Sequence, residues 1–181
     1  MKSHNLSKSI IIFSTLAVLT LGLTGCATLR YEAKSDNIRA VADQIASYTV
    51  PEGYREEFAV ELMDYQLVSL IGPETNSHIY LIQAPEDVEV NIDQLQQQAA
   101  VMNADEDTDP GQMRVVETRQ VEICGQSTNL VIQEGLNSES QPYRSATAVF
   151  EGRNGPALVS ISSYVSVWNP ELTDDFLASL D

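Results

Sequence analysis

The sequence predicts an α+β domain, in which an antiparallel sheet of about six or seven strands is covered by three helices: N-terminal, middle and C-terminal. Three observations favour this class. Polar and apolar residues alternate in several runs, short turns rich in Gly, Pro and Asn separate many of these runs, and three other segments repeat apolar residues at helical spacing. Strands joined by short turns pair antiparallel, and the apolar face of their sheet needs a layer of helices.

The first helix is predicted after Asp36, which fits an N-cap. Behind it, apolar residues recur at helical spacing: Ile38, Val41, Ala42, Ile45 and Ala46. The sequence Pro51-Glu52-Gly53 breaks this pattern. Alternating residues then predict three strands, at 58–62, at 66–71 and at 78–83.

A second helix is predicted within 91–102, where four apolar residues share one face: Ile92, Leu95, Ala99 and Met102. Alternation returns at Met113. It predicts strands at 113–123 and 130–133, connected through a two-residue hairpin at Gly125-Gln126.

Strands at 144–150 and 158–165 complete the predicted sheet. The last of them is apolar on both faces, which is typical of a central strand. A C-terminal helix is predicted after Asn169, with Pro170 in its first turn. Its buried stripe would consist of Leu172, Phe176, Leu177 and Leu180.

The first 25 residues have the features of an export signal. Two lysines precede a run of 14 uncharged residues, Ile10–Leu23, whereas a spanning helix needs about 20 apolar residues. The run ends in Leu23-Thr24-Gly25-Cys26, which resembles the lipobox of bacterial lipoproteins. The resemblance implies cleavage between Gly25 and Cys26 and a diacylglycerol on the Cys26 thiol. The alternatives are a secretory signal with an incidental cysteine and an uncleaved anchor.

The same resemblance implies a place in the cell envelope. The residue after the cysteine is Ala27 and not aspartate, which implies the outer membrane, on its periplasmic face. Residues 26–35 are then expected to form a lipidated tether, and residues 36–181 a single α+β domain.

The predicted mature chain is strongly acidic. Its 156 residues carry 26 acidic and 8 basic side chains, a formal charge of −18. Nucleic acid is excluded as a partner, because phosphate binding needs clusters of Lys and Arg. Anionic lipid headgroups would also be repelled, so the acyl group must anchor the protein. The acidity indicates either a solvated acidic surface or a basic ligand or partner.

His78 is the only histidine of the predicted mature chain, and Cys124 is its only free thiol. The chain contains no Gly-x-Ser-x-Gly, His-Glu-x-x-His or Cys-x-x-Cys motif. We therefore interpret His78 as a surface turn residue and Cys124 as a half-buried, unreactive thiol. No catalytic residue and no intramolecular disulfide are predicted.

Asp105, Asp107 and Asp109 carry carboxylates at every second position, as at the start of an EF-hand calcium loop. Pro110 stands where that loop needs glycine, and Val116 stands where it needs a bidentate glutamate. We interpret the segment as a solvated acidic turn, with Ca²⁺ binding as the alternative. No other metal or cofactor is predicted.

Three aromatic residues, Tyr143, Tyr164 and Trp168, are candidates for lining a ligand groove. Aromatic residues in strands more often belong to the core, which is the alternative. A pair of carboxylates could perform acid–base chemistry, but 26 acidic residues single out no pair.

Three short sequences carry a second resemblance: Pro51-Glu52-Gly53-Tyr54, the Gly155-Pro156 pair before a strand, and the ending Phe176-Leu177-Ala178-Ser179-Leu180. Together with the order of elements they are similar to PsbP-like and DcrB-like α/β sandwich domains, over residues 36–181. These domains include exported lipoproteins. The resemblance implies a binding or assembly factor and assigns no site residue.

The function predicted from the sequence is a non-catalytic envelope lipoprotein that binds a protein partner or a small ligand near the membrane. Two alternatives stay open: an enzyme that uses a carboxylate pair or a bound metal, and a calcium-stabilised sensing or adhesion module that uses the 105–109 turn.

Overall fold

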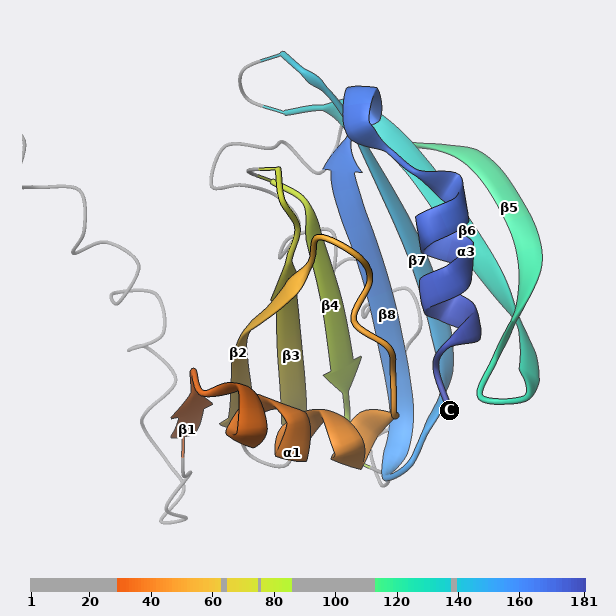
Figure 1. Cartoon of the computed structure of the whole chain (residues 1–181). Helices are drawn as coiled ribbons and strands as arrows, with labels where there is room; N and C mark the ends of the chain where they lie inside the picture. Colours follow the sequence, from red (N-terminus) through yellow and green to blue (C-terminus); the bar gives the residue numbers. More distant parts are fainter. Residues whose placement is uncertain (1–28, 63–64, 75, 86–112, 138–139) are drawn as a thin grey trace, which may run out of the picture.

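A computed structural model describes residues 29–62, 65–74, 76–85, 113–137 and 140–181 (Figure 1). In these residues eight strands form one antiparallel sheet in the order β1-β2-β3-β4-β8-β7-β6-β5. The strands are β1 (Leu29–Glu32), β2 (Arg55–Leu62), β3 (Tyr65–Ile71), β4 (His78–Gln83), β5 (Arg114–Ile123), β6 (Gln126–Leu136), β7 (Pro142–Gly152) and β8 (Gly155–Tyr164).

Two short α-helices, α1 (Ser35–Ile45) and α3 (Pro170–Ala178), lie on the same face of the sheet. Helix α1 crosses β2, β3 and β4, whereas α3 lies over the half that contains β5 (Figure 1). A single 3₁₀ turn, η3 (Val165–Val167), leads from β8 toward α3. None of the helices in the described residues is long and apolar enough to cross a bilayer.

The prediction of six or seven strands covered by three helices is wrong. The sheet has eight strands, and in the described residues it carries only two short α-helices. The additional strand is β1, which has four residues and pairs antiparallel with β2. So short an edge strand is defined by its hydrogen-bonded ladder and not by a periodicity of its own. The middle helix predicted at 91–102 lies outside the described residues.

The sheet consists of two antiparallel meanders, β1–β4 and β5–β8, which meet where β4 pairs with β8. Strand β8 is therefore central, as predicted, and every residue from 157 to 163 is buried. The predicted hairpin between β5 and β6 is confirmed, one residue earlier than expected. Cys124 (φ 49°) and Gly125 (φ 70°) form the turn, and two successive positive φ values are typical of a type I′ hairpin.

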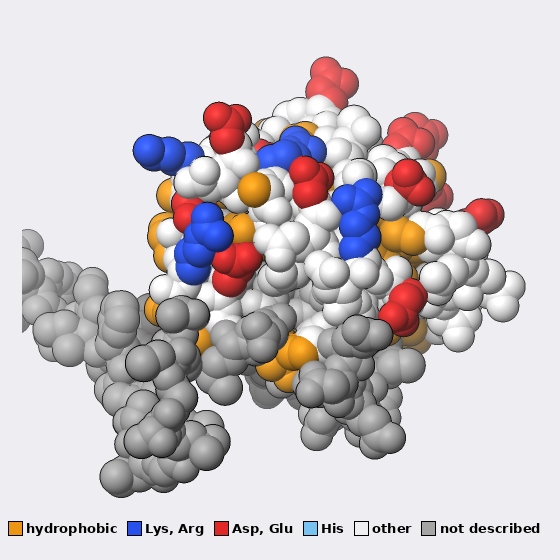
Figure 2. All heavy atoms as spheres, turned by 90° about the horizontal axis from the view of Figure 1, so that it is seen from below, with side chains coloured by type: hydrophobic (Ala, Val, Ile, Leu, Met, Phe, Trp, Pro, Cys, Tyr) orange, Lys and Arg blue, Asp and Glu red, His pale blue; other side chains and the backbone are white. Residues whose placement is uncertain are grey.

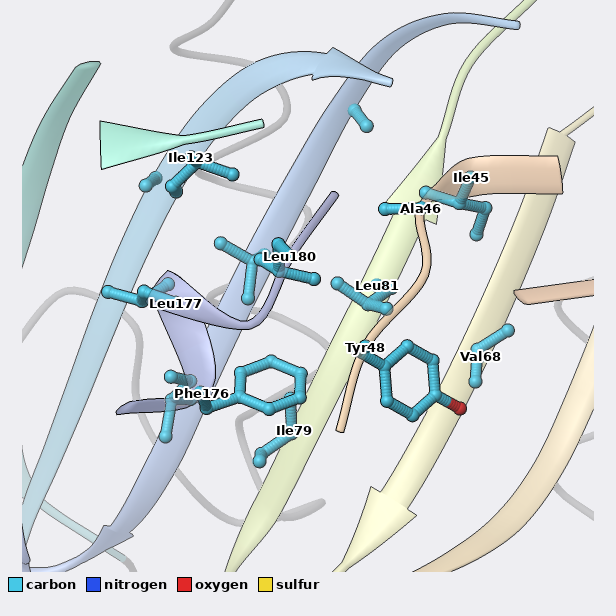
Figure 3. Packing of buried hydrophobic residues seen from close by; sticks show 14 of the residues in the cluster. Ile45, Ala46, Tyr48, Val68, Ile79, Leu81, Ile123, Phe176, Leu177 and Leu180 are labelled. Carbon is cyan, nitrogen blue, oxygen red and sulfur yellow. The ribbon is translucent and has the colours of Figure 1, made fainter. Parts of the chain in front are cut away.

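The core lies between the helices and the sheet. Figure 3 shows the rings of Tyr48 and Phe176 side by side, with Leu81 and Ile79 of β4 next to them. The two rings are 5.9 Å apart and tilted by 57°, a favourable arrangement for an aromatic pair. The apolar stripes predicted for both helices supply most of their core residues: Ile38, Val41, Ala42, Ile45, Phe176, Leu177 and Leu180.

The opposite face of the sheet has a different composition. Small hydroxyl side chains occupy neighbouring strands there and are buried: Ser69, Ser145, Thr147, Ser160 and Ser162. A small apolar cluster of Ile82 and Leu158 lies next to this hydroxyl row. Since successive residues of a strand point to opposite faces, β8 presents valine and isoleucine to the helices and serine to the other side.

Candidate functional site: a groove between the α1–β2 loop and α3

A groove runs along the helical face between residues 49–54, which precede β2, and the segment from η3 to α3. It consists of two hollows of about 250 and about 240 Å³. Both are lined by Glu52, Asn169 and Leu172, so the two hollows adjoin, and we call the pair the groove.

Apolar and aromatic side chains make up about half of the described residues that line the groove. One hollow contacts Pro51 and Phe176, and the other contacts Ile161 of β8 together with Tyr54 and Trp168. Tyr54 is half-buried, and burial raises the pKa of its phenol. These rings and aliphatic side chains offer an apolar surface to a ligand.

Tyr54 depends on a close approach to the turn between β3 and β4. A Cβ atom added at Gly72 would lie 2.9 Å from the Tyr54 ring and 2.7 Å from the Ser77 Cβ. Only glycine leaves room for this packing. Gly72 thus positions one wall of the groove, a role that its place in a predicted turn does not reveal.

The rim of the groove is acidic. Four of the described lining residues carry carboxylates, and all four are exposed: Glu52, Glu74, Glu171 and Asp175. None of the described lining residues is basic. The guanidinium of Arg144 lies 5.6 Å from the centre of the Trp168 ring. Arg144 in turn donates to the Glu134 carboxylate, so its charge is partly compensated.

Hydrogen bonds join the α1–β2 loop on one side of the groove to the end of α3 on the other. The backbone of Ser47 exchanges two hydrogen bonds with Asp181, at 2.7 and 3.1 Å. The Thr49 amide donates to Ser179 Oγ at 3.2 Å. These contacts connect the α1–β2 loop to the end of α3 and hold the width of the groove.

Asn169 shapes the other side. Its side-chain oxygen accepts hydrogen bonds from the amides of Glu171 and Leu172, at 3.0 and 3.2 Å. This is the N-cap predicted from the sequence. It places Glu171 and Leu172 at the groove by fixing where α3 begins.

The structure separates the three aromatic candidates. Trp168 lines the groove. Tyr143 and Tyr164 instead form an edge-to-face pair at 6.2 Å, and the Tyr164 hydroxyl accepts a hydrogen bond from Asn137 Nδ2 at 3.3 Å. The sequence did not single out Tyr54 or Glu52 as site residues; their Pro-Glu-Gly-Tyr context indicated a break between a helix and a strand and a family resemblance that assigns no site.

His78 lies on the opposite face of the sheet, at the start of β4. The predicted strand that begins at His78 is confirmed, whereas the interpretation as a surface turn residue is wrong, because the His78 side chain is only 23% exposed. Its ring stacks on Tyr80 at 5.6 Å, and Nδ1 is 3.9 Å from Glu57 Oε2. The Glu57 carboxylate also accepts a hydrogen bond from Ser69 Oγ at 2.9 Å.

Cys124 is half-buried, as predicted. Burial, together with the nearby negative charge of Asp181, raises the pKa of its thiol. Less thiolate is then present at neutral pH, which agrees with the interpretation of an unreactive cysteine.

The remaining candidates, Gly25, Cys26, Asp105, Asp107 and Asp109, lie outside the described residues. Among the residues that the structure describes, no group of three His, Cys, Asp or Glu side chains is arranged to hold a metal ion. Comparison with known proteins gives no match, either to a family model or to a curated sequence.

Proposed function

We propose that the chain is a non-catalytic binding module of the bacterial cell envelope, anchored through acylated Cys26, whose groove receives a basic segment of a protein partner. One observation carries the choice of ligand: an apolar and aromatic groove is rimmed by four carboxylates and by no basic side chain among the described lining residues. Such a groove suits side chains that join an apolar stem to a positive end, as lysine and arginine do.

The size of the hollows favours a peptide over a small molecule. Pockets for drug-sized ligands measure about 300 to 1,000 Å³, whereas the two hollows measure about 250 and about 240 Å³. Each is suited to one or two side chains. Two such hollows in a row fit an extended segment that places successive side chains in them.

The charge of the whole chain supports the same partner. A formal charge of −18 on the mature chain would draw a basic partner toward the protein and would repel an acidic one. Association is then expected to become slower as salt is added, because exposed charges are screened over about 8 Å at physiological ionic strength.

Trp168 makes the ligand directly testable, since it is the single tryptophan of the chain and lines the groove. We expect a tryptophan-free peptide, acetyl-Arg-Leu-Arg-amide, to change Trp168 emission saturably, and acetyl-Glu-Leu-Glu-amide to leave it unchanged. Equal responses to both peptides, or no saturable response to the first, would contradict the basic ligand.

A pair of double variants separates the groove from the overall charge. Glu52→Gln with Glu171→Gln should weaken the arginine peptide by about tenfold, because two rim carboxylates together contribute roughly 1.4 kcal/mol. Glu122→Gln with Glu151→Gln removes the same charge from exposed positions on β5 and β7. This control should retain nearly full affinity.

The anchor is tested independently. Mass spectrometry of protein isolated from its native cells should find Cys26 as the first residue, carrying acyl chains. A Cys26→Ala variant should leave the membrane fraction. A protein that retains residues 1–25, or one whose Cys26 thiol is unmodified, would contradict the anchor and leave the groove hypothesis standing.

A further inference from the structure

Apolar side chains gather on the sheet face opposite the helices, where β1, β2 and β3 lie together. The register aligns Leu29 with Leu62 and Leu62 with Tyr65 across three strands, and Tyr31 with Val60 in the next row. We name these five residues the edge patch. Leu29 and Tyr31 are each 62% exposed and Tyr65 is 40% exposed, so large apolar side chains stand in solvent at one corner of an acidic protein.

The other side of β1 is polar, and its negative charges are partly compensated. Arg30 pairs with Glu32 at 2.8 Å and with Glu61 at 3.1 Å. The Asn37 amide also donates to Glu32 at 2.6 Å. Arg30 thus pairs with both described carboxylates on this side of β1 and offsets part of their charge, which reduces their repulsion of lipid phosphates.

The distance to the proposed anchor decides what lies against the edge patch. Leu29 follows Cys26 by three positions, and an extended chain advances at most about 3.6 Å per residue. Leu29 thus lies within roughly 11 Å of the acylated residue. The headgroup layer on each side of a bilayer is itself about 5 to 8 Å thick, so a lipid on Cys26 brings β1 to that layer.

We propose that the edge patch rests on the bilayer that holds the acyl chains and forms a second contact with the lipid headgroups. The inference depends on the acylation proposed above. Tyrosine suits this position because it is enriched where hydrocarbon meets headgroups. Leucine adds apolar area at the same level. Figure 2 shows hydrophobic side chains among basic and acidic ones along its left margin, the side on which β1 lies in Figure 1.

This contact orients the groove. In Figure 1, β1 lies at one lower corner and the start of α3 at the upper, opposite end. A protein that rests on the edge patch therefore presents the groove away from the bilayer, toward a partner in the aqueous space. The lipid and the groove would then be used together and not compete for the same surface.

The test bypasses cellular acylation, so that its failure is distinct from a failure of the anchor. The mature chain with Cys124→Ser would be coupled through Cys26 to maleimide-phosphatidylethanolamine in phosphatidylcholine vesicles. Tyr31→Trp, in a Trp168→Phe background, places the single tryptophan of the variant in the edge patch. On coupling to the vesicles its emission maximum should shift to the blue, and brominated phosphatidylcholine should quench its emission. Val115→Trp in the same background is the control, because Val115 is 57% exposed on the opposite edge strand.

Equal quenching at both positions, or none at position 31, would overturn the proposal. A blue shift at position 31 that depends on protein concentration without vesicles would assign the edge patch to a second copy of the chain instead. The second measurement is hydrogen exchange on the coupled chain that keeps Tyr31 and Trp168. Amides of residues 29–32 should gain protection on coupling to vesicles, and those of β5 should not.

Discussion

The two helices lie on the same face of the sheet but are stabilised in different ways. Asn169 is the N-cap of helix α3, and its side chain accepts hydrogen bonds from the amides of Glu171 and Leu172. At the start of α1, Lys34 occupies the N-cap position and makes no side-chain cap bond. The predicted cap, Asp36, lies inside the first turn instead, where its charge still favours the helix start.

The end of α1 shows where its support comes from. Arg153, in the turn between β7 and β8, donates from its side chain to Asp43 O at 2.7 Å and from its backbone to Ile45 O at 2.9 Å. Asn154 donates to Gln44 O at 2.9 Å. The end of α1 is thus capped by residues more than 100 positions away, whereas the start of α3 is capped by the adjacent Asn169.

The close approach of that hairpin requires a glycine. A Cβ atom at Gly152 would lie 2.7 Å from Gln83 Oε1 and 3.1 Å from Ile45 O. The comparison teaches that two helices of similar length can differ in what holds them. The start of α3 is capped by an adjacent residue, and the end of α1 is capped by a turn of the sheet.

The largest expected effect comes from removing the contact that the two helical segments share. Phe176 is 2% exposed and packs against Tyr48. Phe176→Ala should lower the free energy of unfolding by about 3 to 5 kcal/mol, through lost burial and a residual cavity. Urea denaturation measures it. A loss below about 1 kcal/mol would mean that the helical layer is not one packed core.

The distant cap is tested next. Arg153 also bonds Ser47 Oγ and Asp181 O, so Arg153→Ala should cost about 1 to 2 kcal/mol. In hydrogen exchange, the amides at the end of α1 should lose protection while those of α3 retain it. Arg55→Ala, an exposed cation on β2, is the control for the lost charge and should change stability little.

Tyr48, which packs against Phe176, should make the free energy of unfolding depend on pH. Burial, and then the charge of Glu56, raise the pKa of Tyr48 well above its ordinary value near 10. Above pH 10 the unfolded chain releases this proton and the folded chain keeps it, so the unfolded state binds fewer protons. The free energy of unfolding should therefore fall as the pH rises above 10, by up to about 1.4 kcal/mol per pH unit.

Tyr48→Phe isolates this contribution. The variant keeps the ring but loses the hydroxyl that donates to Glu56 at 3.1 Å. Its stability should fall less steeply between pH 10 and 11 in urea denaturation. The half-buried Tyr54, whose pKa is also raised by burial, would contribute the slope that remains. Identical slopes for the two proteins would contradict the assignment.

The smallest effect separates the two helix starts. Asn169→Ala should cost about 1 kcal/mol, because two amides of α3 lose their partner. Lys34→Ala removes the N-cap residue of α1 and should change the free energy of unfolding by only a few tenths of a kcal/mol. Thermal unfolding compares them. Equal losses would show that the starts of α1 and α3 are not stabilised differently.

Much of the fold follows from local pattern. The sequence predicts the buried stripe of α3, its cap, the hairpin at Cys124 and the central place of β8, because each depends on residues near to one another. It predicts too few strands, since the ladder of β1 with β2 joins segments about 30 residues apart. Of the groove, only Trp168 was a candidate, because the walls come from residues 49–54 and 161–176, more than 100 positions apart.

By itself, the sequence determined where α3 begins, the burial of Phe176 and Leu177, and the alternation that makes the strands. It did not predict that Leu172 is only partly buried or that Thr173 is buried. Only the tertiary structure decided that Leu29–Glu32 is a strand, that α1 ends at the β7–β8 turn, and that Glu52, Tyr54 and Trp168 share a groove. The physical reason is how far along the chain the hydrogen-bonding and packing partners of each feature lie. A side-chain cap or a tight turn satisfies backbone groups from within a few residues, whereas an edge strand, a distant cap and a groove obtain theirs from segments that only folding brings together.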